Sequence, residues 1–372
     1  MDSYVYIDGK KYKRGYTTGA TTTAAIKGAL YMLLNQKKIE HIKIDTPKNI
    51  VLDLNLIDQR IEKNFASCAV IKDGGDDIDE TSGIKIYAEV RLNDCGQINL
   101  FGKKGVGVIT KKGLGLEIGE YAINKTPRAM IEKEAKKLLP KGNGIDVYIT
   151  IPKGEEVAKK TFNPKLGIIG GISIIGSTGI VEPMSKEAFK KSLSLELNMK
   201  KEEGINNICF AFGNHGIDYL KKSGVDEKNI ARTSNFIGFM LDEAKRMNFK
   251  KIYLCGHLGK LIKVSAGIFD THSKVADGRI ETIIYNLALL KADYEIIKEI
   301  SKCVTTEAAI EIINDNNLNK VFNIIANNAK DKIMQRIKDE EIEIEVEIFD
   351  LEKNFLGKSD NANRLLEVFI SD

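Results

Sequence analysis

The sequence lacks the features that define several classes of protein. Its five cysteines are an odd number and form no C-x-x-C pair, which argues against a disulfide framework and against a zinc knuckle. The N-terminal residues contain no apolar core of a signal peptide. The apolar stretch 166–181 is interrupted by five glycines and is too short to span a membrane comfortably. We therefore expect a cytoplasmic protein without a membrane partner.

An excess of charge of one sign is also missing. The 372 residues include 56 basic and 52 acidic side chains, a net charge of +4, so no strong field for nucleic acid is expected. Hydrophobic residues make up 43% and charged residues 29%, which is ordinary for a globular protein. The length is sufficient for two domains with separate cores.

Several catalytic motifs are absent. The sequence has no P-loop, no G-x-G-x-x-G, no H-E-x-x-H and no G-x-S-x-G elbow. The acidic loop Asp73–Asp79 fails the EF-hand spacing, because Ile84 would occupy the twelfth position. A capped turn is the simpler explanation of this loop, although Asp76 and Asp77 could face a substrate. We predict no metal site.

The first part of the chain, residues 1–163, predicts an α+β domain, because helices and strands occur in mixed order. Thr17 or Thr18 is the expected N-cap of the first helix. Apolar spacing predicts helices over 17–36 and 127–139, and strands at 41–45, 51–57, 65–71, 84–90, 97–101 and 145–151.

The second part, residues 164–372, predicts an α/β domain with a mainly parallel sheet, after a boundary at Asn163-Pro164. Glu341–Phe349 alternates apolar and acidic residues, which predicts a strand with one wet, acidic face. The other expected strands are 166–175, 207–212 and 251–255, and the expected helices are 185–202, 216–223, 278–300, 305–314 and 319–338.

Lys165–Ser185 is the most distinctive segment. Its isoleucine-rich run predicts a strand buried on both faces, followed by a glycine-rich turn and a helix start. Open α/β sheets build nucleotide and cofactor sites in this way. A buried strand with an ordinary tight turn explains the segment equally well. The candidate cofactor-binding residues are Gly170, Gly171, Gly176, Ser177, Thr178 and Gly179.

Two further clusters in the first part could hold anions. Arg14–Gly19 places Thr17 and Thr18 at a helix N-terminus, which can bind a carboxylate or a phosphate, although simple capping is the preferred explanation. Gly102–Gly115 interleaves glycines with four lysines. It could form an anion-binding flap or a solvated hairpin.

Three of the four histidines lie beside glycine or hydroxyl residues in loops expected after strands. They are His215, His257 and His272. Loops at the carboxyl ends of parallel strands converge on the ligand crevice. A single histidine is more often structural, but three in such positions favour a site, and their ordinary pKa suits proton transfer.

Seven segments in order resemble the cobalt-precorrin-5B C1-methyltransferase family (CbiD type) of anaerobic cobalamin biosynthesis. The resemblance spans nearly the whole chain and is least distinctive over the last seventy or so residues. The matching segments are 14–25, 72–83, 102–114, 122–131, 167–185, 235–244 and 255–279.

The resemblance implies methyl transfer from S-adenosylmethionine to C1 of a ring-contracted cobalt tetrapyrrole, which gives cobalt-precorrin-6A. The ordinary D/E-x-G-x-G-x-G methyltransferase turn is absent. A flat macrocycle with many carboxylates needs several cations and a wide cleft, expected between the domains. The substrate-binding candidates are Arg14, Thr17, Thr18, Asp76, Asp77, Arg128, Lys260, Lys263 and Arg279, and the proton acceptors are His257, His215 and His272.

Two other functions are compatible with parts of this pattern. A nicotinamide-dependent oxidoreductase could use the same strand and turn, but the missing G-x-G-x-x-G counts against it. A non-catalytic tetrapyrrole carrier would keep the anion-binding loops and need no adenosyl pocket. Titration with S-adenosylmethionine and with NADH separates the three.

Overall fold

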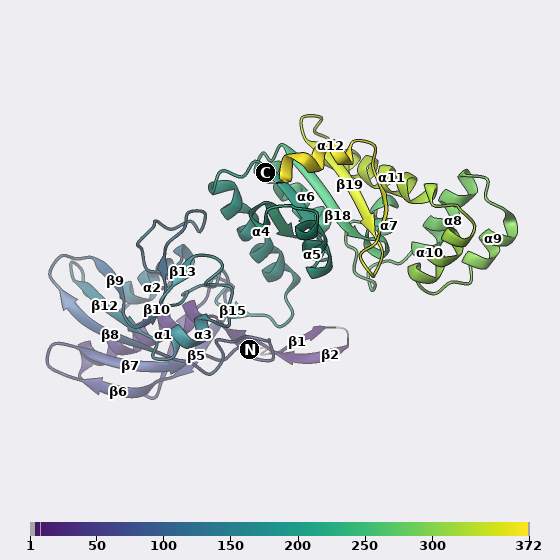
Figure 1. The fold of residues 1–372 in the computed structure, drawn as a ribbon. Helices are drawn as coiled ribbons and strands as arrows, with labels where there is room; N and C mark the ends of the chain where they lie inside the picture. Colours follow the sequence, from purple (N-terminus) through teal and green to yellow (C-terminus); the bar gives the residue numbers. More distant parts are fainter. Residues whose placement is uncertain (1–3, 8, 371–372) are drawn as a thin grey trace. The chain divides into compact units, whose positions relative to one another are not determined.

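The chain divides into two compact units, of which the first ends at Lys186 and the second begins at Glu187 (Figure 1). The structure is a computed structural model that describes residues 4–7 and 9–370. No helix of these residues is long and apolar enough to cross a membrane.

The first unit is built on a five-stranded sheet with the order β6-β7-β8-β12-β9. Neighbouring strands are antiparallel, except that β9 runs parallel to β12. The predicted α+β architecture and most of its strand positions are confirmed. The strands are β6 (Ile57–Ile61), β7 (Ala66–Ile71), β8 (Lys85–Asn93), β9 (Ile98–Gly102) and β12 (Gly144–Thr150).

Helix α1 (Thr18–Asn35) packs on β7, β8 and helix α2 (Lys125–Lys136). Its N-cap is Thr17, whose side chain accepts a hydrogen bond from the Ala20 backbone N–H at 3.2 Å. Almost every residue of α1 is buried, so its three consecutive threonines direct their hydroxyls to carbonyls four residues earlier in the chain. This arrangement satisfies polar groups inside the core.

The remaining elements of the first unit are short. Strands β1 and β2 form one antiparallel pair, and β4 and β5 form another. Their bounds are β1 (Tyr4–Ile7), β2 (Lys10–Lys13), β3 (Gly15–Tyr16), β4 (His41–Asp45), β5 (Val51–Asn55), β10 (Gly105–Val106), β11 (Val108–Ile109) and α3 (Gly154–Ala158).

The predicted boundary after residue 163 is wrong. Residues 168–181 form three two-residue strands that pair with strands of the first unit. These strands are β13 (Ile168–Ile169) with β11, β14 (Gly171–Ile172) with β10, and β15 (Ile180–Val181) with β3. The single long strand predicted at 166–175 is also wrong. Gly170 interrupts it with a φ of 82°, and Ile169 and Ile175 are 60% and 46% exposed.

The second unit is an α/β fold around a five-stranded sheet with the order β17-β16-β18-β19-β20. The first four strands are parallel and β20 is antiparallel, which confirms the predicted mainly parallel sheet. The strands are β16 (Asn207–Ala211), β17 (Ile230–Arg232), β18 (Lys251–His257), β19 (Glu343–Phe349) and β20 (Phe355–Lys358).

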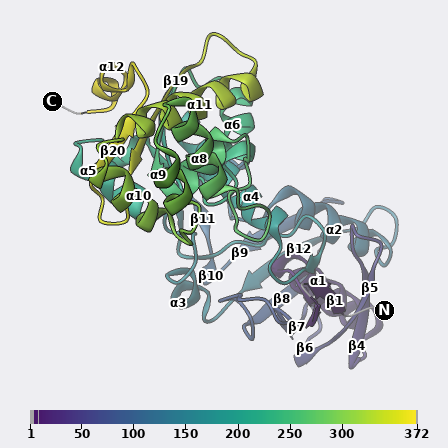
Figure 2. The same cartoon turned by 90° about the vertical axis from the view of Figure 1, so that its right-hand side faces the viewer.

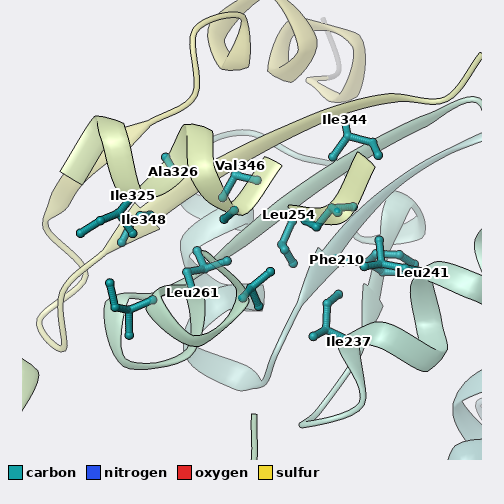
Figure 3. Close-up of a cluster of buried hydrophobic side chains, with 14 of the residues drawn as sticks. Phe210, Ile237, Leu241, Leu254, Leu261, Ile325, Ala326, Ile344, Val346 and Ile348 are labelled. Atoms are coloured by element: carbon teal, nitrogen blue, oxygen red, sulfur yellow. The ribbon is translucent and has the colours of Figure 1, made fainter. Parts of the chain in front are cut away.

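Helices cover both faces of this sheet. One core cluster joins alternate strand residues to α4 (Lys186–Glu202), α6 (Ile237–Arg246), α7 (Leu258–Ser265) and α11 (Lys320–Ile337). Figure 3 shows Val346 and Ile348 of β19 beside Ile325 and Ala326 of α11. The other cluster joins the opposite face to α5 (Asn214–Lys222) and α12 (Ala362–Leu366).

The acidic face of β19 is buried, so the prediction of a wet face is wrong. Glu345 and Glu347 are 1% and 6% exposed, because α5 and α12 cover this face of the sheet. Each carboxylate has partners. Tyr219 and Tyr253 donate to Glu347, and Lys330 and Ser359 donate to Glu345. Burial and the nearby Glu347 charge raise the pKa of the Tyr253 phenol.

Three helices, α8 (Arg279–Leu289), α9 (Tyr294–Ile300) and α10 (Thr306–Asp315), form a group that also contacts α7 and α11 (Figure 2). The sequence predicted a continuous helical segment over 278–300. The structure divides it because Lys291 is left-handed, with a φ of 57°, and Asp293 caps a new helix.

Candidate functional site

The sheet of the second unit changes its winding direction between β16 and β18. The chain leaves β16 through α5 and returns as β17 on one side, and it then enters β18 on the other side of β16. Ligands of open α/β sheets bind beyond the carboxyl ends of the strands at such a point. The loops that follow these three strands therefore form the candidate site.

His257 is the last residue of β18 and the N-cap of α7. Its Nδ1 accepts a hydrogen bond from the Gly259 backbone N–H at 3.0 Å. Its Nε2 lies 2.7 Å from Glu307 Oε1, within ion-pair distance but outside hydrogen-bond geometry. Burial lowers the pKa of His257, although the carboxylate of Glu307 acts in the opposite direction. Because Nδ1 is occupied by the Gly259 N–H and Nε2 faces Glu307, the arrangement favours the capping role over the proton acceptor.

Two lysines of α7 donate hydrogen bonds to uncharged oxygens. Lys260 Nζ donates to Asn235 Oδ1 at 2.5 Å, and Lys263 Nζ donates to the Ala276 carbonyl at 2.7 Å. Lys263 is only 3% exposed. Among the described residues, no carboxylate lies within 4.0 Å of either nitrogen. Burial, followed by the charge of Lys263, lowers the pKa of Lys260. Such a pair favours an anionic ligand.

The two other predicted side chains of this region already have partners. Arg279 donates to both carboxylate oxygens of Asp277, at 2.6 and 3.0 Å, and this interaction raises its pKa. His272 Nδ1 accepts a hydrogen bond from the Lys274 backbone N–H at 3.1 Å. A ligand of Arg279 would therefore share its guanidinium with Asp277.

The glycine-rich turn predicted to bind a cofactor lies in the first unit, not in the α/β unit as expected. A Cβ on Gly176 would lie 2.3 Å from Thr17 Oγ1, and a Cβ on Gly179 would lie 2.8 Å from Thr46 Cβ. The Thr17 backbone N–H donates to the Gly179 carbonyl at 3.0 Å. Close packing against Thr17 at the start of α1 explains Gly176, and close packing against Thr46 explains Gly179.

Arg128 lines a hollow of about 650 Å³ in the first unit. Lys136, Lys141 and Glu132 also line this hollow, and Ile98 and Leu100 supply apolar surface. Arg128 Nε donates to the Ile123 carbonyl at 2.7 Å, and its Nη2 is 3.9 Å from Glu120. Another hollow, of about 620 Å³ and lined by Tyr87, Arg91, Lys103, Tyr148 and neighbouring residues, contains none of the predicted site residues.

Comparison with known proteins gives matches over the whole chain. The CbiD family model matches residues 5–183, and the model of the CbiD C-terminal domain matches residues 270–360. The cobalt-precorrin-5B C(1)-methyltransferase of Clostridioides difficile (strain 630) is 48% identical over 408 aligned positions, which cover 100% of both chains. The chain belongs to the CbiD family.

Other CbiD relatives are similar over the same extent. Proteins with the same name from Photorhabdus laumondii and Alkaliphilus metalliredigens are 46% and 44% identical, over 99% and 100% of this chain and 98% and 99% of theirs. A crystal structure of cobalamin biosynthesis protein (cbiD) from Archaeoglobus fulgidus is 30% identical, covers 74% of this chain and 86% of that chain, and has a TM-score of 0.40.

The CbiD segments near the N-terminus hold one another in place. Thr18 Oγ1 accepts from the Ile175 backbone N–H at 2.9 Å and lies 3.1 Å from the Ser173 carbonyl, to which it donates. A Cβ on Gly171 would lie 2.1 Å from the Gly105 carbonyl oxygen. Thr178 Oγ1 donates to the Ile180 carbonyl at 2.9 Å. Ser177 precedes Thr178 in the bend before β15, and Gly170 lies between β13 and β14.

The acidic loop of the CbiD chain makes similar internal contacts. Asp76 accepts a hydrogen bond from the Lys13 backbone N–H, and Asp77 accepts one from the Met184 backbone N–H at 3.0 Å. Arg14 Nη2 lies 3.3 Å from Glu182 Oε1. The loop therefore ties residues 13–14 to residues 182–184, as a capped turn would. Binding of substrate by these side chains stays a prediction.

Several residues near the carboxyl ends of the strands in the second unit were not predicted from the sequence. Arg232 ends β17 and donates to Asn214 Oδ1 at 2.6 Å. Asn235 contacts Lys260, and Glu307 contacts His257. The three-residue strand β17 carries too weak a pattern to be recognised, whereas Asn235 begins one of the segments that resemble the CbiD family.

Proposed function

We propose that this chain transfers a methyl group from S-adenosylmethionine to C1 of cobalt-precorrin-5B and forms cobalt-precorrin-6A. The observation that carries the proposal is the 48% identity to the Clostridioides difficile methyltransferase over the full length of both proteins. The cobalt ion belongs to the substrate and is not a resident metal of the protein.

The reaction forms one carbon–carbon bond and breaks one carbon–sulfur bond. C1 of the macrocycle supplies the electron pair, and S-adenosylhomocysteine leaves with the electrons of the broken bond. The methyl donor supplies an already activated carbon, so the main task of the protein is to align the two reactants. Any proton that leaves the macrocycle needs an acceptor.

Cations in each unit can bind the acetate and propionate groups of the substrate. In the first unit, Arg128 lies with Lys136 and Lys141 around apolar surface, a combination that suits a flat macrocycle with a charged rim. In the second unit, Lys260 and Lys263 lack carboxylate partners among the described residues. We expect these side chains to contribute more binding free energy than Arg279, which already pairs with Asp277.

The three histidines differ in the contacts that their ring nitrogens already make, and a ring without such contacts is the best candidate for the proton acceptor. His257 caps α7 and contacts Glu307, and His272 accepts from the Lys274 backbone. His215 is exposed, and its ring makes no hydrogen bond to the described residues. His215 is therefore the first candidate to test.

The test is an anaerobic single-turnover reaction of the full chain with S-adenosylmethionine and cobalt-precorrin-5B. Mass spectrometry should show a product heavier by one methyl group and an equal amount of S-adenosylhomocysteine. Tetrapyrrole binding without donor turnover would indicate a carrier, and oxidation of NADH would indicate an oxidoreductase. Either result would reject the proposal.

The contribution of Arg128 is tested with a matched variant of the same helix. Arg128→Gln should weaken substrate binding roughly 10- to 100-fold, because a charge-assisted hydrogen bond is lost. Lys133→Gln removes a side chain of α2 that is 63% exposed and lies outside the hollow. It should bind substrate as the parent does. Equal affinities for all three proteins would remove Arg128 from the substrate site.

A further inference from the structure

The loop between β17 and α6 contains a strained residue. Ser234 has a φ of 51°, a left-handed conformation that a residue with a Cβ seldom adopts and that is often found at functional sites. The loop is anchored on both sides of it. The buried Thr233 donates its backbone N–H to the Ala211 carbonyl at 2.8 Å, and the Asn235 carbonyl accepts the Thr271 N–H at 3.0 Å. Asn235 is therefore held in one position beyond the carboxyl end of β17.

The side-chain amide of Asn235 has a fixed orientation. Its Oδ1 accepts from Lys260 Nζ at 2.5 Å and from Thr271 Oγ1 at 3.4 Å. An ammonium group can only donate, so the amide oxygen must face Lys260 and the NH₂ group must face away from it. This NH₂ group makes no hydrogen bond to the described residues. Asn235 and Lys260 are both half-buried, so a ligand can reach them.

Lys260 differs from other lysines of low exposure in having an uncharged partner. Its ammonium contacts only Asn235 and the Thr271 carbonyl, and Asp270 attracts it from beyond 4.0 Å. Lys263 behind it is 3% exposed and also donates only to carbonyls. Elsewhere in the described chain, lysines of low exposure pair with carboxylates, namely Lys27 with Glu134, Lys72 with Asp79 and Lys330 with Glu345.

We infer that Lys260 and Asn235 together bind one carboxylate group of a ligand. Lys260 supplies the charge, and the NH₂ group of Asn235 supplies a second hydrogen bond. A neutral amide suits this role because it holds the ammonium in place without cancelling its charge, whereas an aspartate at position 235 would replace the ligand. The inference rests on the proposed function, in which both the tetrapyrrole and the methionine end of the methyl donor carry carboxylates.

The experiment measures the affinity of the full chain for S-adenosylhomocysteine and, under anaerobic conditions, for cobalt-precorrin-5B. Asn235→Asp keeps the shape of the side chain and the contact with Lys260, so it should unfold at no lower urea concentration than the parent. It exchanges the NH₂ group for a negative charge and should weaken one of the two ligands roughly 10- to 100-fold. The ligand that is weakened identifies the source of the carboxylate. Parent affinity for both ligands would overturn the inference.

A matched control makes the same substitution beside another lysine. Asn206 is exposed just before β16, at the amino end of the sheet, and its Oδ1 accepts from Lys201 Nζ at 2.7 Å. Asn206→Asp should leave both affinities unchanged, and a loss equal to that of Asn235→Asp would overturn the inference.

A variant of Lys260 tests whether the two side chains share one ligand. Lys260→Gln should weaken the same ligand as Asn235→Asp by a similar factor, and weakening of the other ligand alone would overturn the inference. A parent that binds both ligands without methylating the substrate would reject the proposed function alone, because the two affinities still decide the site. A parent that binds neither ligand would reject both.

Discussion

His257 Nδ1 accepts the backbone N–H of Gly259 at 3.0 Å, so the ring closes the first turn of α7. The accepting nitrogen carries no proton, and the proton of the neutral ring must therefore be on Nε2, beside Glu307. In this tautomer the ring has no free lone pair with which to accept another proton. His257 thus acts on the structure of the candidate site through α7, the helix that carries Lys260 and Lys263.

Replacement of His257 separates capping from proton transfer. His257→Ala removes the cap and should destabilise the chain by about 0.5–2 kcal/mol. Asparagine is a good N-cap residue and cannot act as a base at neutral pH, so His257→Asn should recover most of this loss and retain turnover. Urea unfolding and single-turnover methylation provide the two readouts. A fall of 10²-fold or more in the rate of a well-folded His257→Asn protein would restore the general-base role.

Stability should also depend on the protonation of His257. Burial lowers its folded-state pKa below the ordinary value of 6.5, so the unfolded chain binds this proton more readily. The free energy of unfolding should therefore fall as the pH drops below about 6.5, down to the folded-state pKa. His257→Asn should show a smaller decrease between pH 7.5 and 5.5 when both proteins are unfolded in urea. Identical pH profiles would contradict the predicted pKa shift.

Gly176 should be essential for stability because of Thr17. Gly176 has a φ of 133°, and an added Cβ would lie 2.3 Å from Thr17 Oγ1. Gly176→Ala should cost more than Gly170→Ala, because Gly170 has a φ of 82° but open space around its Cβ position. Gly170→Ala is the control, because it should lose stability only through backbone strain, about 1–2 kcal/mol. Thermal unfolding checks the order of the two variants, and equal losses would mean that Thr17 moves aside easily.

The buried carboxylate of Glu347 should make Tyr253 important for the second unit. Tyr253 and Tyr219 both donate to Glu347. Tyr253→Phe leaves a charged oxygen with one donor fewer and should destabilise the chain by about 1.5–3 kcal/mol. Tyr285→Phe alters a side chain that is 61% exposed and should have no measurable effect. A neutral Tyr253→Phe variant would show that Glu347 is held by its other neighbours.

Local sequence patterns predicted those helices and strands that carry a capping residue or a regular apolar spacing of their own. Thr17 marks the start of α1, and apolar residues with period two mark β4, β5 and β12. The alternation of strands and helices predicted the parallel sheet of the second unit. Boundaries shifted by a few residues, because caps and adjacent packing decide where an element ends.

The candidate site was harder to predict, because its residues come from distant segments. The turn Gly176–Gly179 has the local pattern of a cofactor loop, but its glycines are required by Thr17 and Thr46, which are far away in the sequence. Arg232 and Asn214 meet only through the pairing of β17 with β16. Neither contact leaves a periodic signal.

The sequence alone determined the family, the two-part organisation and the class of each long element, since ordered motifs and periodic burial are properties of the chain itself. Only the tertiary structure decided where residues 164–186 belong and whether the glutamates of β19 face water. Strand pairing places 168–181 in the first unit, and the helices over the second sheet bury Glu345 and Glu347. A short strand takes its environment from its neighbours, and alternation along it cannot reveal what covers each face.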